Sequence, residues 1–417
     1  MKKTAIQTFV SRFLILILNF GLVIFTTNYW GSSGKGIISI VIADLAIVGF
    51  VGNIFVGSSV TYFASKLKTE QILPYAYLWA VLSGVSVPFL IGFTHQQDFL
   101  SYLIILSVLT SLLSANINLF VGRRNIKNFN IYTILQQGLQ ILFILGLVYL
   151  FNETEVQTYF VGQILCLLLL VAVSTYQILK HCDFSAISFS KDIIKKLFDY
   201  GCKIQFSSFL QFLNYRLSFY FIEFFKGLSS VGIYSIGVAL SEAIWTVSRS
   251  LSVVLYSDVV NTSDQNAAIV KTKTSLKIST LVTFIFILIL FAIPAQIYVL
   301  IFGKDFGQSK EVIFLLSPGI LAIAASNILG NYFAGMNKLR ILNVKSIVGV
   351  LFTIAGSWYL IPKWGIAGAC IVTTVSYCVS SAILFWKFYQ ITDFDIRDFL
   401  LSKGEISLLL KSLQRRK

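Results

Sequence analysis

Charged residues are scarce in this chain. They make up 12% of its 417 residues, whereas an ordinary soluble domain carries about a quarter. Hydrophobic residues reach 56%, and the mean hydropathy is +0.81. The low charge, with only five prolines, also excludes a disordered or fibrous chain. The composition therefore excludes a cytosolic enzyme, a secreted module and a nucleic-acid-binding domain, and it indicates a membrane protein.

The chain also contains few histidines and cysteines, two and five respectively. No CxxC pair or Cys/His cluster suggests a metal, and no cysteine falls in an expected external loop, so we expect neither a metal site nor a disulfide framework. No P-loop is present, which argues against hydrolysis of ATP by the chain itself. We expect a protein without cofactor that is not an enzyme.

Long apolar runs are what the chain does contain. A helical span needs roughly 20 mainly apolar residues. The runs predict about 12 spans, at 6–28, 37–63, 73–93, 99–121, 131–151, 157–179, 199–225, 229–257, 274–302, 311–334, 341–361 and 365–389. The expected fold is an all-α polytopic membrane protein with two six-helix lobes around a central polar cavity. Its expected parts are an N-terminal lobe (1–180), a cytoplasmic linker (181–198), a C-terminal lobe (199–390) and a basic cytoplasmic tail (391–417).

The basic residues alternate between the expected loops. With the N-terminus in the cytoplasm, 24 of the 33 Lys and Arg residues lie in cytoplasmic segments and only five in external ones. This bias follows the positive-inside rule and predicts that both termini are cytoplasmic. The net charge of +15 is therefore explained by topology and by contacts with anionic lipids, without nucleic acid as a partner.

Seven ionisable residues fall inside the expected spans, where each would cost about 2.5–3.5 kcal/mol at a helix centre. They are Arg12, Asp44, Lys203, Arg216, Glu223, Glu242 and Arg249. Lys203 is close enough to a span end to reach the interface, and Lys345 is set aside as a span-edge residue. The others are expected to face a polar interior, unless they form purely structural ion pairs or, for Glu223, lie near the outer end.

Polar residues accompany these charges at helical spacing. Ser207, Gln211, Asn214 and Ser218 form one stripe, and Ser235, Glu242, Arg249 and Tyr256 form another at every seventh position. Asn19 shares a face with Arg12. The segments Gly34–Ile40 and Ser230–Ile236 are weakly similar, and each precedes an acid, Asp44 or Glu242. Two similar halves with polar residues at mid-depth are typical of a secondary transporter.

Two regions resemble a known family. The chain from Ser11-Arg12 through Trp30–Gly36 to Ser59–Phe63, together with Phe212–Leu217 and Val231–Ser235, is similar to bacterial polysaccharide-biosynthesis transporters. These are O-antigen-type flippases of the multidrug/oligosaccharidyl-lipid/polysaccharide exporter superfamily. Many members carry an acid two residues after the arginine of the seventh span, where this chain has Ser218. Glu223 and Glu242 are the nearby replacements.

The resemblance implies a flippase that moves a polyprenyl-pyrophosphate-linked oligosaccharide across the plasma (bacterial inner) membrane by alternating access. A pyrophosphate cannot cross hydrocarbon unaided, and arginines are its natural partners. We expect a substrate-binding set and an ion-coupling or gating set that could use H⁺ or Na⁺. The first comprises Arg12, Asn19, Gln211, Asn214, Arg216 and Arg249, and the second Asp44, Glu223 and Glu242.

Two alternatives stay open from the sequence. One is an ion-coupled multidrug or small-metabolite exporter, although a small-drug exporter would need no basic interior. The other is a membrane-embedded polysaccharide polymerase or glycosyltransferase, which would usually place carboxylates or histidines in a sizeable loop; the external loops here are short. Expected partners are the lipid-linked oligosaccharide, membrane lipids, and the polymerase and glycosyltransferases of the same pathway.

Overall fold

The computed structural model describes residues 2–92, 97–180, 182–183, 190–262, 264–336 and 338–392, almost entirely as α-helix and without a strand among them. The helices are α1 (Lys2–Val56), α2 (Ser58–Ala64), α3 (Leu73–Gly92), α4 (Leu100–Gly122), α5 (Ile126–Leu150), α6 (Gln157–Leu179), α7 (Lys191–Lys226), α8 (Leu228–Asn261), α9 (Gln265–Ala292), α10 (Ala295–Phe302), α11 (Ser309–Gly335) and α12 (Leu339–Thr392). Short 3₁₀ turns lie at Thr69–Gln71, Gln97–Phe99 and Lys304–Phe306. Side chains of the first 13 residues, including Arg12, lie outside this description, as do residues 393–417 of the expected tail.

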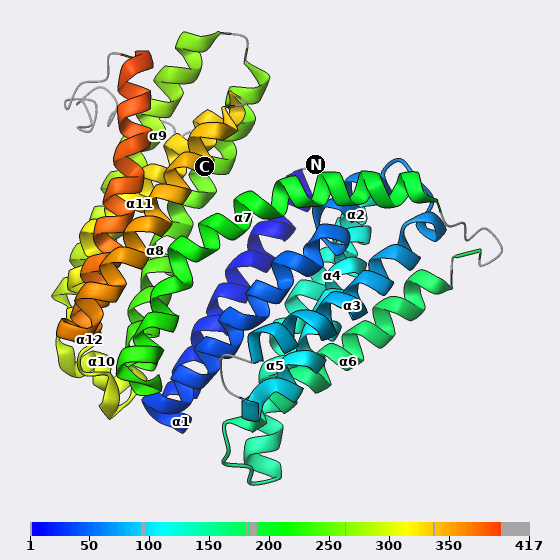
Figure 1. Ribbon diagram of the computed structural model, residues 1–417, viewed down its shortest axis with the longest axis horizontal. Helices are drawn as coiled ribbons and strands as arrows, with labels where there is room; N and C mark the ends of the chain where they lie inside the picture. The colour runs from blue at the N-terminus through cyan, green and yellow to red at the C-terminus, as the bar shows by residue number, and fades with distance from the viewer. Residues whose placement is uncertain are drawn as a thin grey trace. The chain divides into compact units, whose positions relative to one another are not determined.

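Two of these helices are interrupted by a single glycine. Gly31 (φ 63°, ψ −165°) breaks α1, and Gly365 (φ 56°, ψ −129°) breaks α12. A positive φ is available to glycine at little cost, whereas a residue with a Cβ is strained there. The chain turns back at each break (Figure 1), so each of these helices covers two of the expected spans.

Nine helices among the described residues are long and apolar enough to cross a membrane. The long α7 is not one of them, because charged and polar residues interrupt its apolar sequence. The run expected at 274–302 is divided between α9 and α10, with Pro294 at the break. The number of twelve spans stays a prediction.

The chain forms two compact units, each with its own core. The first unit comprises Met1–Phe209 with Ile301–Gly303, and the second comprises Leu210–Leu300 with Lys304–Lys417. In the first unit α4 contacts α1, α2, α3, α5 and α6, and in the second α11 contacts α8, α9 and α12. α4 and α11 thus play the same central part, because each contacts all the other long apolar helices described in its unit.

The start of α7 belongs to the first unit. Leu197 is fully buried against Phe55 and Tyr75, and the ring of Tyr200 stacks on that of Tyr62 at 4.6 Å. Gly201 lies so close to the backbone of Ile54 that an added Cβ would overlap it. The helix therefore begins at Lys191, within the range expected to be a linker, and the boundary between the two units lies inside α7. The predicted lobe and linker limits themselves stay a prediction.

Candidate functional site

The second unit contains an ion pair between two consecutive helices. Arg216 on α7 and Glu242 on α8 approach to 2.7 Å between Nη2 and Oε1. Their side chains are 26% and 36% exposed, so the pair is half-buried rather than sealed in a core. The guanidinium carbon of Arg216 also lies 5.1 Å from the ring centre of Phe219, one turn along α7. An arginine held in this way still has N–H groups that an incoming anion could reach.

Three aromatic side chains gather beside this pair. Tyr215, Trp245 and Tyr377 come from α7, α8 and α12, with ring centres 5.3, 5.7 and 6.0 Å apart. Such separations are those of favourable aromatic pairs. Gln211 donates a hydrogen bond to the hydroxyl of Tyr215 at 2.8 Å. We call these four residues, with the Arg216–Glu242 pair, the charged aromatic cluster.

Arg249 extends the cluster along α8. It lies four residues after Trp245 and seven after Glu242, and its guanidinium carbon is 6.0 Å from the Trp245 ring centre. The residue is exposed, whereas Trp245 is only 2% exposed and its indole N–H has no hydrogen-bond partner. The predicted stripe on α8 thus brings one acid and one base to the same aromatic group.

Asn214 joins α7 to α12 and, among the described residues, has no recorded contact with the cluster. Its amide donates to the backbone oxygen of Ser346 on α12 at 2.9 Å, and the residue is 7% exposed. An added Cβ on Gly349 would lie 2.4 Å from its Oδ1, so the two helices meet closely here. Ser218, one turn further along, shares a hydrogen bond of 3.0 Å with Thr373. These two members of the predicted stripe on α7 join helices, while Gln211 faces the cluster.

None of the other predicted site residues is recorded in contact with the cluster within the described residues, and three of them, Arg12, Asn19 and Asp44, belong to the first unit. Glu223 is half-buried near the end of α7, and Asp44 is buried in the second segment of α1. Asn19 is exposed on the first segment of α1, and the side chain of Arg12 lies outside the described residues. The roles predicted for all of these residues stay predictions. Within the described ranges, no group of three or more His, Cys, Asp or Glu side chains could hold a metal ion.

Sequence reasoning missed two members of the cluster and the burial of one lysine. Tyr215 and Tyr377 carry no signal of their own in a chain with 19 tyrosines, although Tyr215 directly precedes Arg216. Lys345, set aside at a span edge, is in fact only 8% exposed and donates to Ser326 on α11 at 3.0 Å. It lies a turn and a half inside α12, where neighbouring helices cover it.

Comparisons with known proteins identify a family and a fold for the chain. A family model described as "Polysaccharide biosynthesis protein" matches residues 75–311. The capsular polysaccharide biosynthesis protein CapF of Staphylococcus aureus is 30% identical over 91 residues, which are 22% of this chain and 23% of CapF. An uncharacterized membrane protein of Methanocaldococcus jannaschii is 22% identical over 342 residues, which are 78% of this chain and 67% of that protein. The match thus spans less than a quarter of CapF.

Solved structures share the fold. The lipid II flippase MurJ in an inward closed conformation has a TM-score of 0.73 at 15% identity, covering 98% of this chain and 91% of MurJ. An inward-facing multidrug resistance MATE family transporter of the MOP superfamily has a TM-score of 0.70 at 12% identity, covering 90% of this chain and 94% of that transporter. At such identities the likeness shows the fold alone. It confirms the predicted all-α, two-lobed membrane fold.

Proposed function

Because the chain belongs to the polysaccharide biosynthesis protein family, we propose that it is a flippase for a polyprenyl-pyrophosphate-linked oligosaccharide. The family membership confirms the resemblance seen in the sequence, and the multi-pass helical fold agrees with it. In this proposal the protein moves its substrate across the bacterial inner membrane by alternating access, with both termini cytoplasmic. The role is transport without catalysis, as in the transporters that share the fold.

The observation that carries the proposal is the charged aromatic cluster. A pyrophosphate needs a cation with several N–H groups, and arginine binds phosphate oxygens in a bidentate manner. Arg216 and Arg249 supply two guanidinium groups on neighbouring helices, one of them exposed. Aromatic rings and the Gln211 amide suit the apolar faces and hydroxyl groups of a sugar. Arg12 and Asn19 of the first unit keep the substrate-binding roles predicted for them from the sequence as part of this proposal.

Glu242 gives the cluster a means of coupling. When the pyrophosphate takes the N–H groups of Arg216, the carboxylate loses its partner at 2.7 Å. A carboxylate without a counter-charge inside a membrane protein is unfavourable, so it would bind H⁺ or Na⁺. Substrate and ion would then bias the same conformational equilibrium. Asp44 and Glu223 are the further acids proposed for coupling or gating.

The partners follow from this activity. Membrane lipids surround the helices and would accommodate the polyprenyl tail, and basic cytoplasmic residues would contact anionic headgroups. Glycosyltransferases would act before translocation, and a polysaccharide polymerase would act after it.

A multidrug exporter is the second candidate. Three aromatic rings beside the carboxylate of Glu242 are also what a lipophilic cation would bind, because cations are attracted to aromatic faces. The arginine that neutralises Glu242 disfavours this alternative. The two candidates differ in what they require of Arg216: the flippase needs it and the cation exporter does not.

The test is flipping in proteoliposomes of a fluorescent polyprenyl-pyrophosphate oligosaccharide, followed by quenching with an impermeant reductant. Arg216→Gln should abolish flipping, and Arg216→Lys should keep part of it, since charge remains while the bidentate geometry is lost. Lys271→Gln is the matched control, because Lys271 also pairs with an acid of α8, Asp258, at 3.0 Å but is exposed. Full flipping by the Arg216→Gln/Arg249→Gln double variant would refute the proposal. Efflux of a lipophilic cation by that variant would favour the exporter.

A further inference from the structure

A cavity of about 400 Å³ lies at one end of the second unit, away from the charged aromatic cluster. It is formed where α7 ends, α8 and α11 begin, and α12 bends. Pockets that bind small molecules start at roughly 300 Å³. In the predicted topology this end faces the outside of the cell.

Contacts between chain segments shape this cavity. Lys226, the last residue of α7, donates from Nζ to the backbone oxygen of Pro362 at 3.0 Å. The bend of α12 at Gly365 has a left-handed φ, and the side chain of Lys226 passes within 3.5 Å of where a Cβ of Gly365 would be. The lysine therefore ties α7 to α12 at one rim of the cavity.

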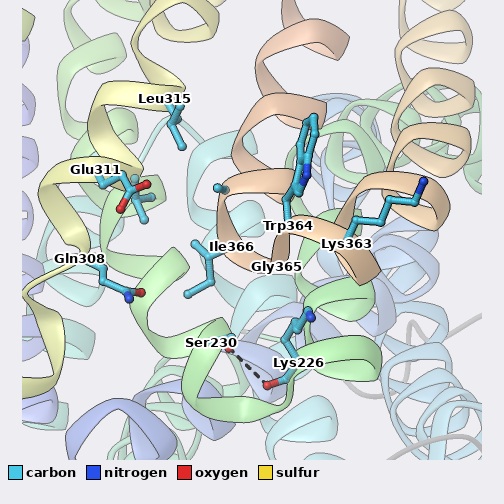
Figure 2. Close-up of a pocket in the computed structure, with 11 residues that line it drawn as sticks. Lys226, Ser230, Gln308, Glu311, Leu315, Lys363, Trp364, Gly365 and Ile366 are labelled. Atoms are coloured by element: carbon cyan, nitrogen blue, oxygen red, sulfur yellow. Dashed lines mark hydrogen bonds between the residues drawn. The ribbon is translucent and has the colours of Figure 1, made fainter.

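The opposite rim carries polar side chains that are open to a ligand. Gln308 and Glu311 belong to the start of α11, and Figure 2 shows both pointing toward α12, from which Ile366 points back at them. Both are exposed, and the structure records no hydrogen bond for either side chain within the described residues. The hydroxyl of Ser230 donates a hydrogen bond to the backbone oxygen of Lys226 at 3.2 Å, and its own oxygen can still accept one.

An aromatic side chain completes the lining. Trp364 borders the cavity and is 57% exposed, so much of its ring is open to a ligand. Lys363 points away from the Gln308 side (Figure 2), and its ammonium lies 3.8 Å from the ring centre of Tyr359. An exposed indole that lines the same cavity as an amide, a carboxylate and a hydroxyl offers a platform for a ring's C–H face together with donors and acceptors for hydroxyl groups.

We propose that this cavity binds a sugar unit of the transported saccharide after it reaches the outside, with Trp364 as its platform and Gln308 and Glu311 as hydrogen-bonding partners. The identity of the ligand rests on the proposed function. The binding itself does not require transport, because the lining belongs wholly to the second unit and shares no residue with the charged aromatic cluster.

The experiment is saturation-transfer NMR on the full chain in nanodiscs, with methyl β-glucoside, methyl β-galactoside and N-acetylglucosamine as probes. At least one probe should receive saturation. Trp364→Ala and Gln308→Ala should each raise its Kd about threefold to tenfold, the loss expected for one aromatic or hydrogen-bonding contact. Both residues are exposed, so these variants should fold. Trp386→Ala is the matched control, because Trp386 is 59% exposed on the same helix but does not line the cavity.

Arg216→Gln separates this inference from the proposed function. It should stop flipping while leaving the Kd of the probe unchanged. Absence of saturation transfer to all three sugars would overturn the inference. So would a signal that disappears in Arg216→Gln and persists in Trp364→Ala, because the sugar would then bind at the cluster. If the native protein fails to flip lipid-linked substrates yet shows the expected Trp364 and Gln308 effects, the cavity is a sugar site and the flippase proposal fails.

Discussion

Replacing Glu242 with glutamine should separate a coupling role from a purely structural one. The substitution keeps the shape of the side chain but removes the charge that pairs with Arg216 at 2.7 Å. If Glu242 couples transport to an ion, the variant should fold and reach the membrane, but its flipping rate should no longer depend on the H⁺ or Na⁺ gradient. If the pair only joins α7 to α8, the variant should lose stability, while the flipping that remains should still depend on the gradient as in the native protein.

The exposure of the pair sets the size of the stability change. Exposed ion pairs contribute about 0.2–1 kcal/mol, whereas breaking a buried pair costs about 3–5 kcal/mol. With side chains 26% and 36% exposed, this pair lies between those limits, and we expect Glu242→Gln to cost about 1–2 kcal/mol. For a unit of roughly 200 residues this corresponds to a fall in Tm of about 2–8 °C. Asp258→Asn, which breaks the more exposed pair with Lys271, should cost about 0.5 kcal/mol or less.

The assay combines thermal unfolding in detergent with flipping under imposed ion gradients. The charge-swapped variant, with Arg216→Glu and Glu242→Arg, should recover much of the lost stability because the pair can re-form. It should not recover transport, since the cation and the acid would have exchanged their places relative to the substrate. Full recovery of both stability and gradient-driven transport by the swapped variant would refute the coupling argument.

Three further predictions concern regions outside the cluster. A cysteine placed at Thr154, in the exposed turn between α5 and α6, should react with an impermeant maleimide in intact cells, whereas the native Cys182 should be protected; the opposite pattern would invert the predicted topology. Gly365→Ala should lower stability by about 1–2 kcal/mol because it forces a Cβ into a left-handed φ, whereas Gly138→Ala, where no neighbouring atom lies within 4 Å, should be neutral or stabilising in a thermal unfolding scan. Burial first, and then the charge of Glu70, raises the pKa of the Cys182 thiol, so in permeabilised cells Glu70→Gln should lower that pKa and speed maleimide labelling at pH 7 by about twofold to fivefold; an unchanged rate would contradict this electrostatic account.

Much of the fold could be predicted because bilayer dimensions impose it. The apolar runs predicted the positions of α3, α4, α6 and α11 within about two residues at each end, as for α6, predicted at 157–179 and observed at Gln157–Leu179. The run expected at 274–302 fits α9 less well, because α9 begins at Gln265 and ends at Ala292. The span limits placed turns near Gly31 and Gly365, but they could not show that each break is confined to one glycine with a positive φ, because only the backbone dihedrals reveal that. The early start of α7 was missed because the apolar contacts of Leu197 depend on residues more than a hundred positions away.

The candidate site was predictable where charge inside a span gives a clear signal. Arg216 and Glu242 stand out in the sequence because ionised groups are costly inside a membrane span. They lie on consecutive helices, α7 and α8, and form an ion pair. The contribution of Tyr377 depends on how α12 packs against α7 and α8, which no spacing within one helix reveals. For the same reason Asn214 and Gln211, at the same helical spacing in one stripe, have different neighbours: one holds two helices together and the other contacts the aromatic rings.

The glycine breaks in α1 and α12 limit how much of the chain is accessible from outside the cell. On the predicted topology, each break joins two membrane-crossing segments through a single non-helical residue, so almost no chain protrudes there for proteases or antibodies to recognise. An epitope inserted at Gly31 or Gly365 would have to unwind helix on both sides. The turn between α5 and α6, exposed at residues 151–155, is the better place for a tag or a label. On the predicted topology, the turns at Gly31 and Gly365 therefore present little antigenic surface.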